Sequence, residues 1–256
     1  MLGTLIYLVL FALSTTYSSD TQSNQLEFRI VGGTPVIYRH EFPYQASIHR
    51  SKQHSCGGTI ISSKNILTAA HCVSGRDKNS FTIFVGLKYL NESKKMTGFK
   101  VVDYMVHPRF EKKTLRYDIA LITLDKALVF NKTVRYIGLR SKPIVPGEKL
   151  IASGWGRTSR DSKTSNILRW VEVTAMNSSD CKHKMRRSSF YVSRHKNICT
   201  TPMIGAGTCN GDSGGPLIDA NDELVGVVSW GKPCAVGWPD IYTSVPYHYN
   251  WIMEQL

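Results

Sequence analysis

Short runs of apolar and β-branched residues recur along most of the chain, separated by glycine, proline and polar turn residues. Such short alternating segments at regular intervals are typical of antiparallel all-β sandwiches and barrels rather than of strand-helix-strand units. Residues 216–228 are predicted to form a hairpin around the turn at 219–222, and only the C-terminal segment 246–256 has a helical pattern, with Pro246 in its first turn. The other predicted strands lie within 46–48, 59–70, 81–85, 100–106, 120–124, 150–156, 168–173, 223–231 and 240–245.

The length of 256 residues and the hydrophobic share of 42% suffice for one large domain or for two small ones that share an interface. Two prolines and a glycine at 142–148 separate strand-rich halves. The apolar run at 2–13 is too short to span a bilayer and precedes small, polar residues. It therefore predicts a secretory signal peptide over residues 1–18, although no lysine or arginine precedes it, and a buried N-terminal strand is the alternative.

In a secreted chain, six cysteines favour disulfides over free thiols, and they allow fifteen pairings. Metal ligation is the competing interpretation, but the sequence contains no CxxC or HExxH spacing, so we expect no metal site. Three Asn-x-Ser/Thr sequons are candidate glycosylation sites, at Asn91, Asn131 and Asn177.

The chain carries 32 lysines and arginines against 19 aspartates and glutamates, a net charge of +13 that favours attraction to acidic surfaces. No aromatic platform or nucleic-acid-binding motif accompanies the densest basic run, so a solvated loop is favoured over a binding site and no nucleic-acid partner is expected. That run comprises Lys182, Lys184, Arg186 and Arg187, with Arg194 and Lys196 nearby.

Ser213 lies in the stretch GTCNGDSGGP, residues 207–216. A serine hydroxyl needs a nearby base to act as a nucleophile, and the surrounding glycines permit a tight turn whose amide N–H groups could stabilise an oxyanion. The same residues fit the G-x-S-x-G elbow of α/β-hydrolases, with Asp240 and His248 following in that fold's order. An elbow opens a helix, however, whereas the residues after Ser213 have a strand pattern, so this alternative is disfavoured.

Five segments resemble the motifs of the chymotrypsin/trypsin family of serine endopeptidases, in the family's order: RIVGG (29–33), LTAAHC (67–72), DIALI (118–122), GDSGGP (211–216) and SWG (229–231). The resemblance covers residues 30–256. It implies an all-β fold of two packed six-stranded antiparallel Greek-key barrels with a C-terminal helix, and a boundary between the barrels near 142–148. It implies no cofactor.

By this resemblance, His71 is the general base, Asp118 orients it and Ser213 attacks the scissile carbonyl. The backbone N–H groups of Gly211 and Ser213 would form the oxyanion hole. Ser229, Trp230 and Gly231 would pair with extended substrate backbone, although Trp230 could simply fill the core. The resemblance also selects three of the possible disulfides: Cys56 with Cys72, Cys181 with Cys199, and Cys209 with Cys234.

The resemblance further implies a zymogen in which residues 19–29 are the activation propeptide. Cleavage after Arg29 by a trypsin-like protease would free the amino group of Ile30 to pair with Asp212. Breaking such a buried pair costs about 3–5 kcal/mol, enough to disorder an oxyanion hole, so the intact chain should be inactive. The alternative is that IVGG merely starts a strand.

Trypsin-like members have an aspartate six positions before the nucleophile, where this chain has Gly207, followed by Thr208. With Gly231 in one wall, these residues favour a neutral pocket for large apolar side chains. Asp240 complicates this interpretation, because a buried carboxylate must be solvated, hydrogen-bonded or neutralised by a basic substrate. The pocket resembles those of arthropod chymotrypsin-like enzymes, so chymotrypsin-like cleavage is favoured over trypsin-like or broad collagenolytic specificity.

The segment 87–95 resembles the calcium loop of vertebrate trypsins but has Leu87 in place of the first acidic ligand, so no calcium site is expected. The expected protein is a secreted, extracellular, monomeric glycoprotein with protein or peptide substrates and protein inhibitors as partners, and with no membrane association. The alternative from another class is a non-catalytic protease-like protein that binds anionic polymers through its basic surface. Such proteins have typically lost a triad residue, and none is missing here.

Overall fold

A computed structural model describes residues 31–256 except 187, 189, 191 and 233. The predicted signal peptide and propeptide, including Arg29, and the predicted new N-terminal residue Ile30 lie outside the described residues. None of the helices formed by the described residues is both long and apolar enough to cross a membrane.

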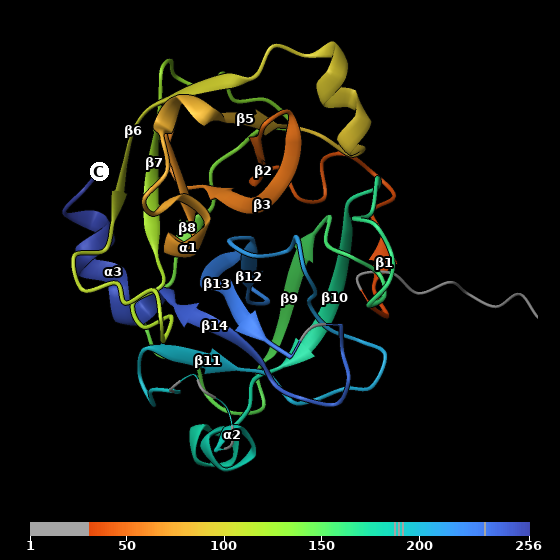
Figure 1. Cartoon of the computed structure of the whole chain (residues 1–256), viewed down its shortest axis with the longest axis vertical. Coiled ribbons are helices and arrows are strands. Elements are labelled where there is room, and N and C mark those ends of the chain that lie inside the picture. Colours follow the sequence, from red (N-terminus) through yellow and green to blue (C-terminus); the bar gives the residue numbers. More distant parts are fainter. Residues whose placement is uncertain (1–30, 187, 189, 191, 233) are drawn as a thin grey trace, which may run out of the picture.

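Six strands of the N-terminal half close into a barrel in the order β2-β3-β4-β7-β6-β5, at the top of Figure 1. Every neighbouring pair is antiparallel. The inward-facing side chains are mostly β-branched, which suits a pleated, buried surface, and Ile48, Ile66, Ile83 and Ile122 are fully buried. The strands are β2 (Gln45–Arg50), β3 (Gln53–Ile60), β4 (Asn65–Thr68), β5 (Phe81–Val85), β6 (Phe99–Val106) and β7 (Ala120–Leu124).

The C-terminal half is a second sheet in the order β1-β10-β9-β12-β13-β14-β11, with β8 added beside β13. β1 (Thr34–Pro35) and β8 (Gly138–Leu139) are only two residues long, and β8 pairs with β13 in parallel. The core of this sheet is built around Leu150, Leu217 and Tyr242. The remaining strands are β9 (Lys149–Gly154), β10 (Arg169–Thr174), β11 (Asn197–Cys199), β12 (Pro216–Ile218), β13 (Glu223–Gly231) and β14 (Asp240–Ser244).

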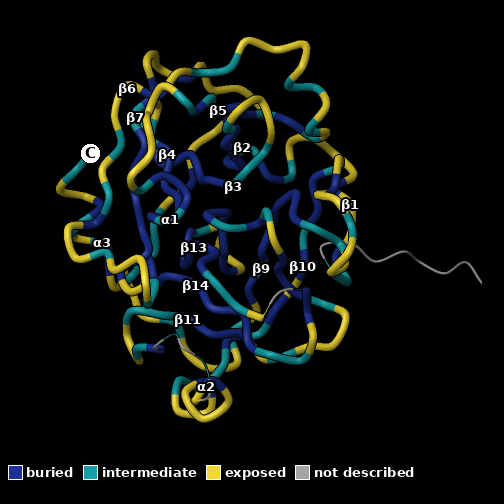
Figure 2. The backbone as a smooth tube through the Cα atoms, in the orientation of Figure 1, coloured by how far each residue is buried: buried dark blue, intermediate teal, exposed yellow. Residues whose placement is uncertain are grey.

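The two halves share one apolar cluster. Ile60 and Leu67 of the barrel belong to the same buried cluster as Leu224 and Val227 of β13. Helix α3 (Val245–Met253) follows the second sheet but returns to this shared cluster, and Figure 2 shows buried backbone continuing through strands of both halves. The shared core fixes the halves against each other, so that residues at their junction keep a defined geometry.

The prediction of an all-β fold with two halves and a C-terminal helix is confirmed. The hairpin β12–β13 forms, and the Ser244 hydroxyl accepts a hydrogen bond from the Tyr247 backbone N–H at the start of α3, with Pro246 in the first turn. The prediction that only the C-terminus is helical is wrong. The chain also forms α1 (Ala70–Val73), α2 (Ser178–Met185) and two 3₁₀ turns, η1 (Lys78–Ser80) and η2 (Leu90–Lys95).

Helix α2 was missed because only Cys181 and Met185 of its residues are buried, which leaves no apolar stripe to detect. Its termini carry the signal instead. The Asn177 side chain accepts a hydrogen bond of 2.9 Å from the Ser179 backbone N–H at the first turn. Asp180 lies in the first turn, and Lys182, His183 and Lys184 lie in the last, matching the helix dipole.

Candidate active site

His71 lies in the short helix α1, which begins directly after strand β4 of the barrel. A disulfide joins the next residue, Cys72, to Cys56 in the neighbouring strand β3. The strand and the disulfide together hold the imidazole at the edge of the barrel that faces the second sheet.

Asp118 is fully buried and receives hydrogen bonds from three groups. The His71 backbone N–H donates to Oδ1 at 2.8 Å, and the Nδ1 atom of the same residue lies 2.7 Å from Oδ2. The Ser229 hydroxyl donates to Oδ2 at 2.6 Å from strand β13. Because the carboxylate accepts a hydrogen bond from Nδ1–H and so fixes the proton on Nδ1, the Nε2 atom of the neutral imidazole is left as the free base.

The charge of His71 is tuned by two opposed effects. Burial disfavours the imidazolium, but the charge of Asp118 and its hydrogen bond to Nδ1 outweigh this, so the pKa of His71 is raised above its ordinary value. The side chain is still 25% exposed, so Nε2 belongs to a ring that solvent or a substrate can reach.

Ser213 is brought to the same place by contacts with the barrel. Its carbonyl accepts a hydrogen bond of 2.8 Å from the Gly57 backbone N–H, and the Cys72 Sγ atom lies 3.7 Å from that carbonyl oxygen. Gly214 has a φ of +80°, and a Cβ there would lie 2.2 Å from the Thr68 hydroxyl oxygen. The glycine is therefore required for the close approach, which sets Ser213 beside the segment that carries His71.

The turn from Gly211 to Ser213 is held from inside by Asp212, which is 1% exposed. Its Oδ1 accepts a hydrogen bond of 2.7 Å from the Gly156 N–H, and its Oδ2 accepts one of 3.0 Å from the Cys209 N–H. A Cβ on Gly156 would lie 2.1 Å from the carboxylate, so this position must be glycine. Burial raises the pKa of Asp212 to about 7 despite these two donors, and the charge of Asp240 adds to the increase.

His54 also contacts this turn, a role that the sequence pattern did not reveal beyond placing a histidine in or beside a strand. Its Nε2 lies 2.9 Å from the Gly211 carbonyl oxygen, and its Nδ1 lies 2.8 Å from the Ser47 hydroxyl. Burial lowers the pKa of His54 to about 4, so the ring is neutral near pH 7. The ring proton then lies on Nε2, and this N–H donates a hydrogen bond to the Gly211 carbonyl oxygen. The hydrogen bond orients the Gly211 peptide group.

The predicted specificity residues also converge. Gly231 pairs with Asp240 across strands β13 and β14, and the Thr208 backbone N–H donates to Asp240 Oδ2 at 2.6 Å. A Cβ on Gly207 would lie 2.7 Å from Oδ2, and one on Gly231 would lie 3.1 Å from Oδ1. The Asp240 carboxylate is therefore flanked by two glycines and bonded to Thr208.

Burial raises the pKa of Asp240 to about 6, and the hydrogen bonds from Thr208 only partly oppose this effect. Trp230, in β13 next to Gly231, contacts Phe190 in a tilted arrangement at a centroid distance of 4.9 Å.

All three expected disulfides are present: Cys56–Cys72, Cys181–Cys199 and Cys209–Cys234. The last joins the segment before Ser213 to the loop after β13, across the pocket that contains Asp240. The Sγ atoms of Cys56 and Cys72 lie within 4.8 Å of a His71 ring nitrogen, but they are bonded to each other, which leaves no thiolate to bind a metal ion.

Comparison with known proteins agrees with this geometry. The trypsin family profile matches residues 30–252. Chymotrypsin-2 of Vespa crabro is 35% identical over 226 residues, which are 88% of this chain and 99% of that protein. Trypsin delta of Drosophila melanogaster is 36% identical over 232 residues, which are 90% of this chain and 89% of that protein.

The chain belongs to the trypsin family of serine endopeptidases. It is thus an enzyme, and protein substrates follow from the family. The similar relatives bear both chymotrypsin and trypsin names, so the preference at the cleaved bond has to be argued from the pocket.

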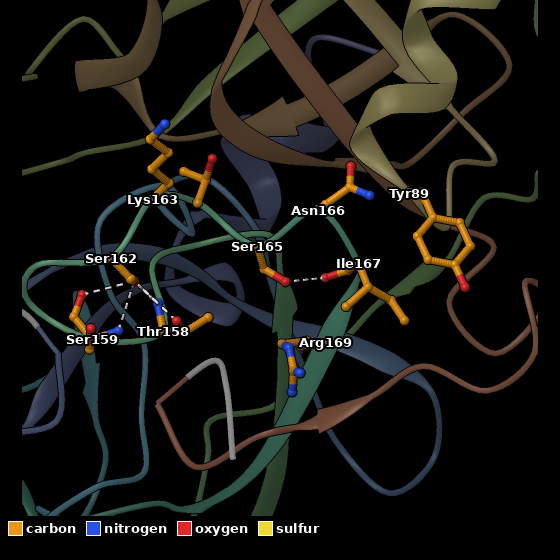
Figure 3. A pocket seen from close by; sticks show the side chains of 10 residues that line it. Tyr89, Thr158, Ser159, Ser162, Lys163, Ser165, Asn166, Ile167 and Arg169 are labelled. Atoms are coloured by element: carbon orange, nitrogen blue, oxygen red, sulfur yellow. Dashed lines mark hydrogen bonds between the residues drawn. The ribbon is translucent and has the colours of Figure 1, made fainter. Parts of the chain in front are cut away.

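A hollow of about 710 Å³ beside the protease's predicted oxyanion turn is not the catalytic centre (Figure 3). Neither His71 nor Ser213 lines it, and its lining includes no carboxylate or imidazole. Ser162 in its wall is held within a local turn, where it accepts hydrogen bonds from the Thr158 and Ser159 backbone N–H groups. A hydroxyl without a base is a poor nucleophile, so the hollow offers no second catalytic centre.

The segment 87–95 of the protease is held by side chains of its own chain. Glu92 accepts hydrogen bonds of 2.9 and 2.5 Å from the Arg39 guanidinium, which also donates to the Gly86 carbonyl at 2.8 Å. Leu87, at the position of the missing acidic ligand, is 3% exposed. Glu92, which supplies the only carboxylate in 87–95, is thus already paired with a cation of the same chain.

Proposed function

We propose that this protein is a secreted serine endopeptidase, made as a zymogen, that hydrolyses peptide bonds by a Ser-His-Asp acyl-enzyme mechanism. We also propose a preference for large apolar or aromatic side chains before the cleaved bond. The observation that carries the proposal is the buried Asp118–His71 pair, with Ser213 on a turn that packs against the same barrel edge.

In this mechanism His71 Nε2 takes the Ser213 hydroxyl proton as the oxygen attacks the scissile carbonyl. Asp118 stabilises the imidazolium that forms, and the backbone N–H groups of Gly211 and Ser213 bind the oxyanion. Each such donor contributes on the order of 3 kcal/mol to the transition state. The imidazolium then protonates the leaving amine, and water, activated by the same histidine, hydrolyses the acyl-enzyme.

Strand β13 has a free edge on which a substrate peptide can bind as an additional strand. On one side, its pairing with β12 and with the two residues before β12 extends only to Val228, whereas on the other side β14 continues to pair as far as Gly231. Residues Ser229 to Gly231 therefore have an edge on which an extended peptide can add by main-chain hydrogen bonds. This edge leads from Asp118, through Ser229, to the Asp240 pocket.

The pocket residues favour an apolar side chain. Gly207 leaves the floor without the acidic group that a trypsin-like pocket has at that position, and Asp240 is hydrogen-bonded within the protein to Thr208. Trypsin-like or broad collagenolytic specificity through Asp240 is the alternative. The test compares kcat/KM of the activated enzyme on peptides with Phe, Leu, Lys or Arg before the cleaved bond, alongside Asp240→Gly. Fast turnover of Lys and Arg with little of Phe or Leu would overturn the preference.

The zymogen proposal is supported by the segment just after the proposed cleavage site. The Gly207 N–H donates to the Val31 carbonyl at 2.9 Å, and a Cβ on Gly32 would lie 2.1 Å from the Gly205 carbonyl oxygen. A new N-terminus at Ile30 would thus start next to the pocket floor, within the half of the protein that holds Asp212. In the proposed division, residues 1–18 are the signal peptide, 19–29 the propeptide and 30–256 the protease.

The activation experiment compares the intact chain, the chain cleaved by trypsin and an Arg29→Gln variant. We expect activity only after cleavage, and none from Arg29→Gln or from cleaved Ser213→Ala. Activity of the uncleaved chain would refute the zymogen proposal without affecting the catalytic one. An inert cleaved chain would instead favour a non-catalytic binding protein.

The three disulfides fit an oxidising compartment, and with the N-terminal apolar run they support secretion. We further propose that the extracellular enzyme is monomeric and that protein inhibitors bind it. Asn91, Asn131 and Asn177 are exposed and remain the proposed glycosylation sites. Intact mass of the secreted protein before and after enzymatic deglycosylation tests this assignment.

A further inference from the structure

Nine lysines and arginines of the described chain gather in two stretches outside the catalytic centre. Within 107–117 and the described residues of 178–196, the only carboxylates are those of Glu111 and Asp180. Every cation of the set except Lys196 is exposed. We call this set the basic face: Arg109, Lys112, Lys113, Arg116, Lys182, Lys184, Arg186, Arg194 and Lys196.

The two stretches meet at Tyr117. The Lys196 Nζ atom donates a 2.6 Å hydrogen bond to the Tyr117 hydroxyl and lies 4.2 Å from the centre of its ring. The Arg109 guanidinium lies 4.8 Å from the same ring centre. The fold thus joins cations that are far apart in the sequence into one surface, which the sequence alone had suggested only as a solvated loop.

The basic face is hollowed at two places. A cavity of about 940 Å³ has Lys182, Arg194 and His195 in its lining. A smaller one, of about 360 Å³, is lined partly by Arg109 and Arg116. The cations that line the larger hollow belong to 178–196, and those that line the smaller one belong to 107–117. A ligand that extends along the surface would therefore meet positive charge in both hollows.

The chemistry of the face favours a linear polyanion that is bound through charge. The Tyr117 ring is engaged by two cations, so it is not open for stacking on a nucleobase, which RNA and single-stranded DNA binding sites use. We propose that the basic face binds a sulfated polysaccharide, whose repeated sulfate groups the spaced lysines and arginines pair with along both hollows. The partner would hold the enzyme on anionic extracellular material.

Binding is measured on the whole chain carrying Ser213→Ala, so the result does not depend on whether the proposed catalysis is correct. The probe is a heparin dodecasaccharide, and isothermal titration calorimetry measures its dissociation constant at several salt concentrations. Neutralising one hollow with Lys182→Gln and Arg194→Gln should weaken binding about tenfold near physiological ionic strength. The slope of log Kd against log salt should become shallower, because fewer counterions are released.

The matched control is Lys94→Gln with Lys95→Gln, which removes the same charge from η2. These lysines are exposed and lie at the opposite end of the molecule from α2 (Figure 1). The control should bind the probe within about twofold of the parent protein. Melting temperatures of all variants show that each is folded.

Three results would overturn the proposal. Equal weakening by the two double variants would mean that the probe responds to net charge alone. Tighter binding of a single-stranded oligonucleotide of the same charge, or of an acidic peptide, would assign the face to another class of partner. A second double variant, Lys112→Gln with Lys113→Gln, tests the stretch 107–117. If this variant binds the probe as tightly as the parent protein, the site is confined to the larger hollow, and the proposal that both stretches form one binding surface is wrong.

Discussion

Asp118 and Asp240 are both buried aspartates near the start of a strand, β7 and β14 respectively, but their surroundings give them different chemistry. Asp118 accepts hydrogen bonds from a backbone N–H, an imidazole and a hydroxyl, and through it the pKa of His71 is raised. Asp240 has Thr208 as its donor and two glycines beside it, and its own pKa is raised to about 6. The donors around a buried carboxylate, rather than burial alone, decide whether it can serve as a fixed negative charge.

The largest expected effect comes from removing the charge at Asp118. Asp118→Asn keeps the side-chain shape but lets His71 adopt the wrong tautomer, so kcat should fall roughly 10⁴-fold, as is general for such triads. The acid limb of the pH profile should also move to lower pH, because the carboxylate no longer raises the pKa of His71. Steady-state kinetics of the activated enzyme between about pH 5 and 9 measure both changes.

Asp219→Asn is the matched control for this variant. Asp219 is also buried and also has a partner, the Arg140 guanidinium at 3.0 Å, but it lies in the turn between β12 and β13. The control should lose stability and keep kcat. A comparable loss of kcat in both variants would contradict a specific role for Asp118.

The next largest effect is a pH dependence of the unfolding free energy that arises from the Asp240 carboxylate. The pKa of Asp240 is higher in the folded protein than in the unfolded chain, so its favourable contribution is present below about pH 4 and is lost as the pH rises through about 6. Relative to Asp240→Asn, the parent protein should lose about 3 kcal/mol of unfolding free energy across this range. Urea unfolding at several pH values, in the Ser213→Ala background, measures the difference.

Asp222→Asn provides the comparison, since Asp222 is exposed and its positive φ of 56° suits asparagine as well. The same urea series on this variant shows how much of the pH dependence comes from the rest of the protein. A pH-independent difference for Asp240→Asn would mean that the pocket carboxylate is already satisfied by Thr208.

A smaller effect is expected at the oxyanion turn. His54→Phe keeps a ring of similar size but leaves the Gly211 carbonyl without its donor, a loss of about 1–3 kcal/mol for a buried acceptor. We expect kcat to fall about tenfold with little change in KM, because His54 acts through the Gly211 peptide group, whose N–H is proposed to bind the oxyanion of the transition state.

His49→Phe is the matched control. This histidine belongs to the same barrel, is 5% exposed, and its Nε2 has no hydrogen-bond partner. Its replacement should leave kcat unchanged. Equal losses in the two variants would point to repacking of the barrel rather than to Gly211.

The sequence was sufficient for the strands made of short apolar and β-branched runs and for the motif residues. Strands β5, β7 and β13 form where these runs placed them, and nearly all of their residues are buried, which suits a continuous apolar run bounded by turn residues. The triad and the disulfides came from the resemblance, because pairings between distant cysteines cannot be read from spacing.

The remaining features depend on contacts that no local pattern encodes. Helix α2 has no apolar stripe, so only its Asn177 cap and charge order mark it. His54 acquires its role from a carbonyl 157 residues away. The basic face likewise exists only because Lys196 reaches Tyr117 across the fold.

The smallest effect belongs to a carboxylate that is neither buried nor surrounded by donors. Glu172 is 54% exposed and lies 2.9 Å from the Nζ atom of Lys149, which is 64% exposed. Water screens both charges, so Glu172→Gln should change the unfolding free energy by less than about 0.5 kcal/mol. A larger loss, measured by urea unfolding beside Asp240→Asn, would show that the ion pair itself matters here, and the contrast between Asp118 and Asp240 could then no longer be attributed to burial and donors.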